Sequence, residues 1–194
     1  MSALTVDHGP ENGWDDLVHR WEEMDWPEGC KVEIIEGIIT VSPPPANDHN
    51  SIAETVQRRL YTAIPDTWGI YQTLGVSVPS RSGLFVPDLV VVPKAALEEP
   101  GHFIPAARSE LIVEITSRSN ARHDRVSKPA GYAQAGVPLY LLIDGWAPGG
   151  PTVTLYGEPK GDVYRVLQAG KFGDAVQLPT PFDLVIDTGR FPVS

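Results

Sequence analysis

The sequence predicts an α/β or α+β fold with a central mixed β-sheet flanked by helices and a β-rich C-terminal part. Short runs of Val, Ile and Leu alternate with segments of helical periodicity, and such runs are typical of buried strands. Beyond residue 151 only strand-like runs remain. With 194 residues and no repeat or clear linker, the chain is expected to form one domain over 1–194. Within it we expect an acidic, helical N-terminal extension over 1–30 and the main body over 31–190.

The first third is expected to hold two helices around a hairpin. An amphipathic helix is predicted over 13–24, because apolar side chains recur there at helical spacing: Trp14, Leu17, Val18, Trp21 and Met24. Residues 31–36 and 38–41 are predicted to pair as a hairpin that turns at Gly37, and prolines stiffen the loop over 42–45. A second helix is predicted over 49–64, with Asp48 or Asn50 as its cap.

The middle of the chain is expected to supply the centre of the sheet. Strands are predicted over 69–78 and 84–92, followed by a polar connection over 94–108 and an apolar strand over 111–116. A polar turn over 117–126 then leads into a short helix over 129–135 that Gly136 ends. Because proline is tolerated in the first turn of a helix, Pro129 places Lys128 at the helix start.

The remainder is predicted to be mostly strands. A buried strand over 137–144 and a loop over 145–151 precede three further strands over 152–156, 163–167 and 182–186. These segments form the β-rich C-terminal part.

Composition restricts the setting of the protein. The formal net charge of −10 argues against strong nonspecific binding to nucleic acid. Residues 1–57 hold twelve acidic and two basic side chains, whereas 58–194 hold thirteen of each, so the acidity belongs to the N-terminal part. The single cysteine, Cys30, cannot form an intramolecular disulfide. With no signal peptide and no apolar stretch near the ~20 residues of a membrane span, we expect a cytoplasmic protein without a membrane partner.

Basic side chains gather in one short segment. Arg118, Arg122, Arg125 and Lys128 lie within eleven residues that hold only one acid, Asp124. Such a loop can bind the phosphates of a nucleic acid, but a solvated surface loop has the same composition. Asp124 is expected to pair with Lys128 or with an arginine of the loop.

Two carboxylates occupy otherwise apolar, β-branched runs. Asp88 follows Pro87 at the head of one run, and Glu114 lies in the middle of another. An isolated carboxylate in a buried strand is costly unless it is paired or bound to a metal. Two of them on neighbouring strands can share a divalent cation through their oxygens. Each residue also has a purely structural alternative. Asp88 can simply start its strand, and Lys128 can face solvent at the start of its helix.

Six blocks of the sequence occur in an order that resembles the Uma-two family of restriction-endonuclease-like proteins, in the PD-(D/E)XK nuclease superfamily. The blocks begin at Glu33, Ser42, Val86, Val113, Asp124 and Tyr132, and the last runs to Asp144. The resemblance covers about 14–190. It implies a restriction-endonuclease-like core and a metal-dependent DNA endonuclease that uses Mg²⁺ or Mn²⁺.

The resemblance also implies roles for individual residues. Asp88 and Glu114 match the two acidic motif positions, with Lys128 as a catalytic lysine that has moved to the following helix because Thr116 stands at the usual lysine position. Glu36 matches a further acidic position and is expected as an additional metal ligand. The arginines at 118, 122 and 125 are expected to contact the DNA backbone, and a homodimer is expected if both strands of a duplex are cut. The Thr116 departure leaves open a catalytically silent fold that acts as a binding module.

Overall fold

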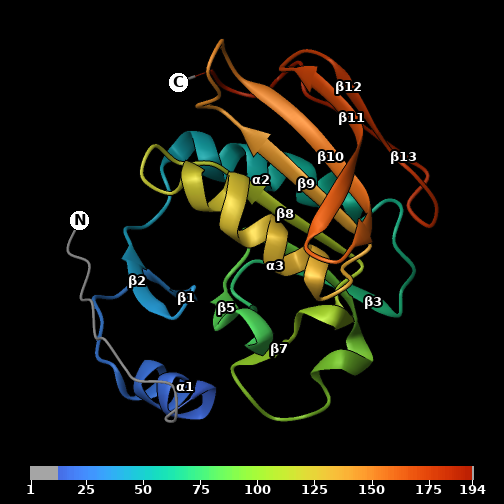
Figure 1. Ribbon diagram of the computed structural model, residues 1–194. Helices are drawn as coiled ribbons and strands as arrows, with labels where there is room; N and C mark the ends of the chain where they lie inside the picture. The colour runs from blue at the N-terminus through green and yellow to red at the C-terminus, as the bar shows by residue number, and fades with distance from the viewer. Residues whose placement is uncertain (1–12, 194) are drawn as a thin grey trace.

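The computed structural model describes residues 13–193, with residues 1–12 and 194 outside the described part (Figure 1). The expected mixed α/β architecture is confirmed, although the strands form two sheets and a separate hairpin rather than one sheet. The chain starts with α1 (Trp14–Glu23), β1 (Lys31–Ile35), β2 (Ile38–Ser42) and α2 (Asn47–Leu60). No helix in residues 13–193 is long and apolar enough to cross a membrane.

The larger sheet has six strands in the order β11-β10-β9-β8-β6-β3. Its bounds are Trp68–Tyr71 for β3, Leu89–Pro93 for β6, Leu111–Ile115 for β8, Leu139–Asp144 for β9, Thr152–Lys160 for β10 and Val163–Lys171 for β11. At its centre β8 pairs with β9 in parallel and with β6 in antiparallel orientation, so the sheet is mixed. The central strands are buried on both faces, which explains their continuous apolar sequences.

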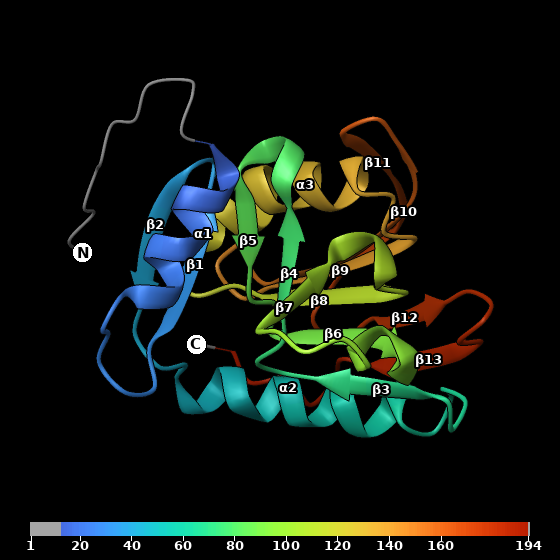
Figure 2. The same cartoon turned by 90° about the horizontal axis from the view of Figure 1, so that it is seen from below.

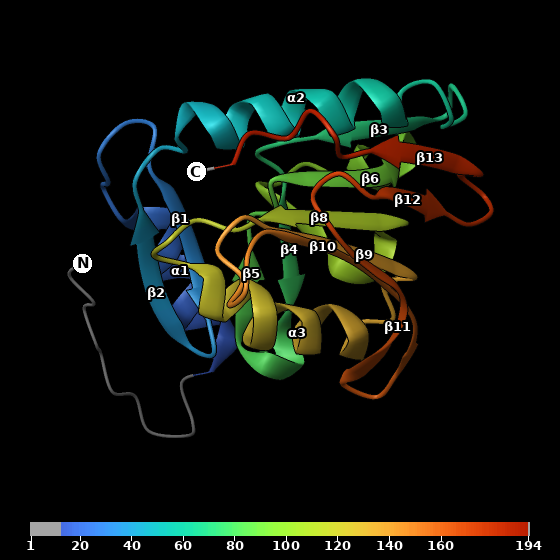
Figure 3. The ribbon, with the colours of Figure 1, turned by 90° about the horizontal axis from the view of Figure 1, so that it is seen from above.

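Alternate residues of the central strands face two different hydrophobic clusters. Leu89, Val113 and Leu141 pack with Val56 and Leu60 of α2. Val90, Ile112 and Tyr140 face the opposite cluster, which includes Tyr132 of α3 (Lys128–Gln134). Strands β6 and β8 accordingly lie between α2 and α3 in Figures 2 and 3. Each fully buried aliphatic side chain of this kind contributes about 1.5–3 kcal/mol to stability.

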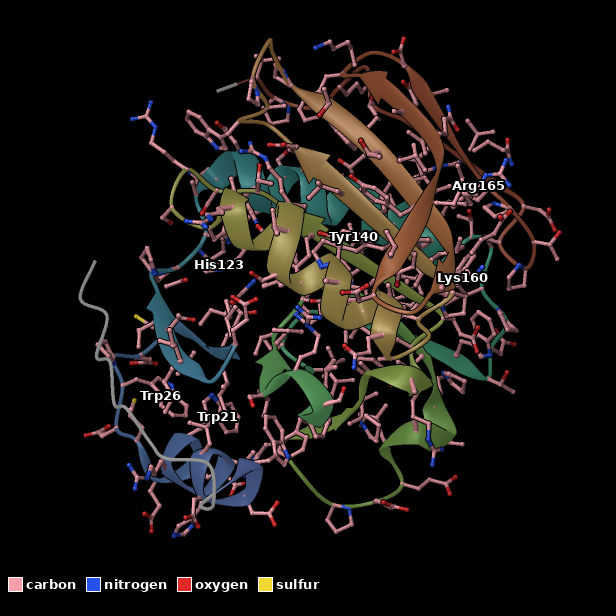
Figure 4. All side chains as sticks on the ribbon, viewed as in Figure 1. Trp21, Trp26, His123, Tyr140, Lys160 and Arg165 are labelled. Atoms are coloured by element: carbon pink, nitrogen blue, oxygen red, sulfur yellow. The ribbon has the colours of Figure 1, made fainter. Side chains whose placement is uncertain are left out.

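The smaller sheet has five strands in the order β2-β1-β5-β4-β7. Its other strands are β4 (Gly75–Val78), β5 (Gly83–Phe85) and β7 (Phe103–Pro105), and a short 3₁₀ turn over Pro79–Arg81 links β4 to β5. Each predicted strand over 69–78 and 84–92 therefore divides between the two sheets. The second division occurs at Val86–Asp88, where Pro87 has no N–H to donate to a neighbouring strand. Helix α1 packs on this sheet through Trp21, whose Nε1 donates to the carbonyl of Val32, and Figure 4 shows Trp21 and Trp26 beside these elements.

The helix that carries Lys128 starts earlier than expected. Helical structure begins at residue 121, passes through a π-helical turn over His123–Ser127, and continues as α3. The N–H of Lys128 donates to the carbonyl of His123, which is the five-residue spacing of a π turn. At the same spacing, the carbonyl of Asp124 would accept a hydrogen bond from residue 129, but Pro129 has no N–H to donate. The hydroxyl of Tyr140 donates to that carbonyl instead, at 2.6 Å. Lys128 thus lies inside a helix and not at its N-terminus.

The C-terminal part is β-rich, as expected. The strands predicted over 152–156 and 163–167 extend further, to residues 160 and 171, the strand predicted over 182–186 covers 184–187, and the strand over 175–178 was not predicted. Strands β10 and β11 form a long hairpin, and β12 (Ala175–Leu178) pairs with β13 (Leu184–Asp187) in a second hairpin. The β12–β13 hairpin packs in the same cluster as α2, through Val176, Leu178 and Ile186.

Candidate metal centre

Asp88 lies immediately before β6, at the end of the sheet where β6 and β8 separate. The register that pairs Leu89 with Val113 places Asp88 and Glu114 at the next position along the two strands. Asp88 Oδ2 accepts a hydrogen bond from the N–H of Ile115 at 2.7 Å and lies 3.0 Å from Nε2 of His49. Asp88 Oδ1 lies 2.6 Å from Nζ of Lys31. The carboxylate is 6 % exposed, so its neighbours replace water almost completely.

Glu114 lies one layer deeper and is fully buried. Its Oε1 accepts from the hydroxyl of Tyr132 at 2.7 Å and from Nζ of Lys128 at 3.0 Å. Its Oε2 is buried without a hydrogen-bond partner in the described part of the chain. A buried carboxylate oxygen without a partner is unusual and costly in a protein interior. This oxygen is therefore available to a further ligand.

Lys128 is surrounded by carboxylates. Its Nζ lies 2.9 Å from Glu33 Oε1, 3.0 Å from Glu114 Oε1 and 3.1 Å from Asp124 Oδ1, and its side chain is completely buried. Glu33 also accepts a hydrogen bond from the N–H of Val86, just before Asp88. The π turn brings Asp124 and Lys128 to the same side of the helix, toward the sheet. The expected pairing of Asp124 with Lys128 is thus found.

The cluster carries more negative than positive charge. Four carboxylates, those of Glu33, Asp88, Glu114 and Asp124, face the two ammonium groups of Lys31 and Lys128. When all of these groups are ionised the formal sum is −2, which is the charge that one divalent cation balances.

The pKa values of the acids follow from burial and from this crowding. Burial, and then the neighbouring charges of Asp124 and Asp88, raise the pKa of Glu114 to about 8. Burial likewise raises the pKa of Asp124, to about 6. Burial would also raise the pKa of Asp88, but Lys31 and His49 outweigh it and hold that pKa well below its ordinary value. Burial opposes the charge on Lys128, yet the carboxylates of Glu114, Glu33 and Asp124 raise its pKa well above the ordinary value. Asp88 and both lysines are therefore charged at neutral pH.

A cleft of about 580 Å³ opens next to Asp88. Its lining includes Lys31, His49, Asp88, Ile115, Arg118 and Trp146, together with the prolines at 43–45. Glu114 and Lys128 do not line it; they lie behind Asp88 and Ile115. A ligand in the cleft therefore meets Asp88 first, with Lys31 and His49 on either oxygen.

The donor set fits a hard divalent cation. Asp88 and Glu114 offer carboxylate oxygens from adjacent strands, and Ile115 lines the cleft. Glu114 Oε2 has no hydrogen-bond partner among the residues that the structure describes. Among residues 13–193, no three His, Cys, Asp or Glu side chains are themselves arranged around one point. The carboxylates do not converge on one point because the ammonium groups of Lys31 and Lys128 lie between them.

Glu36, expected as a further ligand, is not in the cluster. It lies in the turn between β1 and β2 with a positive φ of 52°, and its side chain is 56 % exposed. Its nearest basic partner is Arg81, at 3.9 Å. Residue alternation along β1 instead turns Glu33 toward Lys128 of α3 and Val86 after β5.

The three arginines expected to contact DNA have different positions. Arg118 lines the cleft and stacks on Trp146, with its guanidinium carbon 4.8 Å from the ring centroid. Arg122 is exposed and lies outside the cleft lining. Arg125 binds Asp144 through Nε at 2.7 Å and through Nη2 at 2.9 Å, and it also donates to the carbonyl of Trp146. This side chain is held in place by the protein and does not line the cleft, so its position supports a structural role.

Thr116 has a structural role of its own. Its hydroxyl donates to Asp144 Oδ1 at 2.9 Å, and the N–H of Trp146 also donates to that oxygen. Asp144 is therefore the centre of a network that fixes the loop carrying Trp146 at the edge of the cleft. The usual lysine position is thus occupied by a residue that shapes the cleft.

The sequence did not single out Lys31, Glu33 or His49 as members of the site. Glu33 had the same signal as Glu114, an acid between Val32 and Ile34 in an apolar strand. Lys31 and His49 had no comparable signal, because only the fold brings the start of β1 and the first turn of α2 to Asp88.

Comparisons with known proteins gave one family match and a similar solved structure. A family model named Uma2 and described as “Putative restriction endonuclease” matches residues 14–189. The structure resembles that of a “putative nuclease belonging to DUF820” from Anabaena variabilis ATCC 29413, with 19 % sequence identity and a TM-score of 0.63. The match covers 86 % of this chain and 90 % of that one, and it shows the restriction-endonuclease-like arrangement of the fold. No curated protein matches the sequence.

Proposed function

Because the chain belongs to the Uma2 family, described as “Putative restriction endonuclease”, we propose that it is a metal-dependent DNA endonuclease. One observation supports this most strongly: within residues 13–193, Glu114 Oε2 is buried without a hydrogen-bond partner, in a cluster in which four carboxyl groups face two ammonium groups. A purely structural cluster would be expected to pair that oxygen.

Asp88, Glu114 and the main-chain carbonyl of Ile115 would hold the ion, Mg²⁺ or Mn²⁺. When bound, such an ion polarises the scissile phosphate and lowers the pKa of an attacking water. The protein supplies the orientation of its ligands. The N–H of Ile115 and Nε2 of His49 fix Asp88, and the hydroxyl of Tyr132 and Nζ of Lys128 fix Glu114.

Lys128 acts in this account as a positioning residue. Its ammonium, 3.0 Å from Glu114 Oε1, orients that carboxyl and favours its charged form against the effect of burial. Its complete burial separates it from a substrate in the cleft. Arg118 and Lys31 are the basic side chains that line the cleft and can meet a DNA phosphate. With so few basic groups, binding should depend only modestly on salt concentration.

The proposal is tested by incubating supercoiled and linear DNA with the purified protein in Mg²⁺, in Mn²⁺ or in EDTA. We expect cleavage only with a divalent ion, and its loss in Asp88→Asn and Glu114→Gln. Glu99→Gln, which changes an exposed acid of the 94–108 segment, is the control and should cleave as wild type does. Equal activity of wild type and Asp88→Asn would contradict the proposal. Metal binding without cleavage would favour the alternative that the protein is a catalytically silent binding module, which the threonine at position 116 suggested.

A further inference from the structure

Of the two lysines in the cluster, Lys31 is the one that lines the cleft. Its side chain is 21 % exposed, whereas that of Lys128 is completely buried. Lys31 is the first residue of β1, where it pairs in register with Ser42 of β2, and Ser42 also lines the cleft. The backbone of Lys31 is thus fixed at the cleft wall, and the four-carbon stem leaves its ammonium free to change position.

The two oxygens of Asp88 differ in what they can still bind. Oδ2 faces two protein groups, the N–H of Ile115 and Nε2 of His49, which together use its two lone pairs. Among the described residues, Oδ1 has one close partner, Nζ of Lys31 at 2.6 Å. A cation that approaches Asp88 from the cleft must therefore use Oδ1, the oxygen that Lys31 already contacts.

We propose that Lys31 exchanges partners during the reaction. Its ammonium pairs with Asp88 Oδ1, leaves that oxygen when a divalent cation binds there, and then contacts a phosphate of the DNA. This inference rests on the proposed function. It adds Lys31 as a substrate-binding residue, and a competition between the ammonium of Lys31 and the divalent ion for Asp88 Oδ1.

The exchange follows from the charges involved. An ammonium and a divalent cation on the same carboxylate oxygen would repel each other strongly in a site that is nearly closed to water. Since the backbone of Lys31 is fixed in β1, the displaced ammonium stays at the cleft wall. Arg118 lines the same cleft, so both cations can face one anionic backbone.

Lys31→Met removes the charge and keeps most of the stem, and it should shift two affinities in opposite directions. Titration calorimetry with Mn²⁺ and no DNA should give binding at least about tenfold tighter than wild type, because the ion no longer has to displace an ammonium. Fluorescence anisotropy with a labelled DNA oligonucleotide, with Ca²⁺ in place of Mg²⁺, should give weaker binding. The slope of log affinity against log salt should fall by about one.

Two control variants separate charge from side-chain loss. Lys31→Arg keeps the cation and should bind Mn²⁺ as wild type does. Lys160→Met removes an exposed lysine in the β10–β11 hairpin, far from the cleft lining, and should change neither affinity (Figure 4). If thermal unfolding shows that Lys31→Met does not fold, Lys31→Gln takes its place in both titrations.

The outcomes distinguish this inference from the proposed function. If wild type binds Mn²⁺, Asp88→Asn does not, and Lys31→Met binds no tighter than wild type, the exchange is wrong and the metal site stands. Tighter Mn²⁺ binding with unchanged DNA affinity also overturns the exchange, since it requires both shifts. If wild type binds no Mn²⁺, the exchange and the proposed function both fail.

Discussion

Nζ of Lys128 lies 3.0 Å from Glu114 Oε1, and both side chains are completely removed from solvent. Two further carboxylates, of Glu33 and Asp124, lie within 3.1 Å of the same ammonium. Burying such a cluster costs desolvation free energy, and the attraction between the charges offsets this cost only when every charge keeps its partner. The cluster is therefore stable as a unit and sensitive to the loss of any one member.

The first prediction concerns Lys128. A solvent-facing Lys128, the structural alternative considered from the sequence, would tolerate replacement, but the side chain is completely buried among carboxylates. Lys128→Met should lower the free energy of unfolding by about 3–5 kcal/mol, because it leaves buried carboxylates without their counter-ion. Urea denaturation measures this, with Lys160→Met as a control that should stay within about 0.5 kcal/mol of wild type. A loss below about 1 kcal/mol would show that Lys128 is not the counter-ion described here.

A second prediction compares two glutamates of the β1–β2 hairpin. Glu33→Gln removes a charge next to Lys128 and should cost about 1–3 kcal/mol of unfolding free energy. Glu36→Gln changes an exposed side chain and should stay within about 0.5 kcal/mol of wild type. Denaturation of the two variants under the same conditions checks this order. A larger loss of stability for Glu36→Gln than for Glu33→Gln would contradict the placement of Glu33, and not Glu36, in the cluster.

A third prediction tests the π turn. Tyr140→Phe leaves the carbonyl of Asp124 without the donor that replaces the missing N–H of Pro129, and it should cost about 1–3 kcal/mol. Tyr61→Phe is the control, since that hydroxyl is part of a 55 % exposed side chain and donates over a longer 3.4 Å. The two variants are compared by thermal unfolding. Equal midpoints for Tyr140→Phe and wild type would mean that the turn does not need this bond.

A fourth prediction concerns acid stability. Burial opposes the charge of Asp144, but hydrogen bonds from Arg125, Thr116 and the N–H of Trp146 outweigh it and lower its pKa. A lowered folded-state pKa stabilises the protein above the unfolded-state pKa of about 3.9, and this stability is lost as pH falls through the folded-state value. Asp144→Asn should therefore melt below wild type at pH 7, with the difference shrinking as the pH falls below the ordinary carboxyl pKa of about 3.9. A difference that is independent of pH would contradict this account.

Asp88 and Glu114 could be singled out from the sequence because carboxylates inside apolar strands stand out without any knowledge of the fold. The role expected for Lys128 came from the family resemblance. The mixed sheet could be predicted for a related reason, since buried central strands leave continuous apolar runs. Pro87 also signalled the break between β5 and β6, although the run around it suggested one strand.

The partners of these residues could not be found in the same way. Lys31 and His49 reach Asp88 across 57 and 39 positions of sequence, through the packing of the smaller sheet and α2. Arg125 was expected to face DNA because it lies in a basic loop, but Asp144 lies on the parallel strand next to β8 and binds it. Such pairings depend on strand order and register, which a single sequence does not specify.

The proposed function requires, above all, a divalent ion bound by Asp88 and Glu114. The most direct measurement is the anomalous difference density of a crystal soaked in Mn²⁺. We predict one strong peak between these two carboxylates, in contact with Asp88 Oδ1 and Glu114 Oε2, and no peak in crystals of Asp88→Asn. A Mn²⁺ peak elsewhere with none between the two carboxylates, or the same peak in Asp88→Asn, would contradict the proposed site.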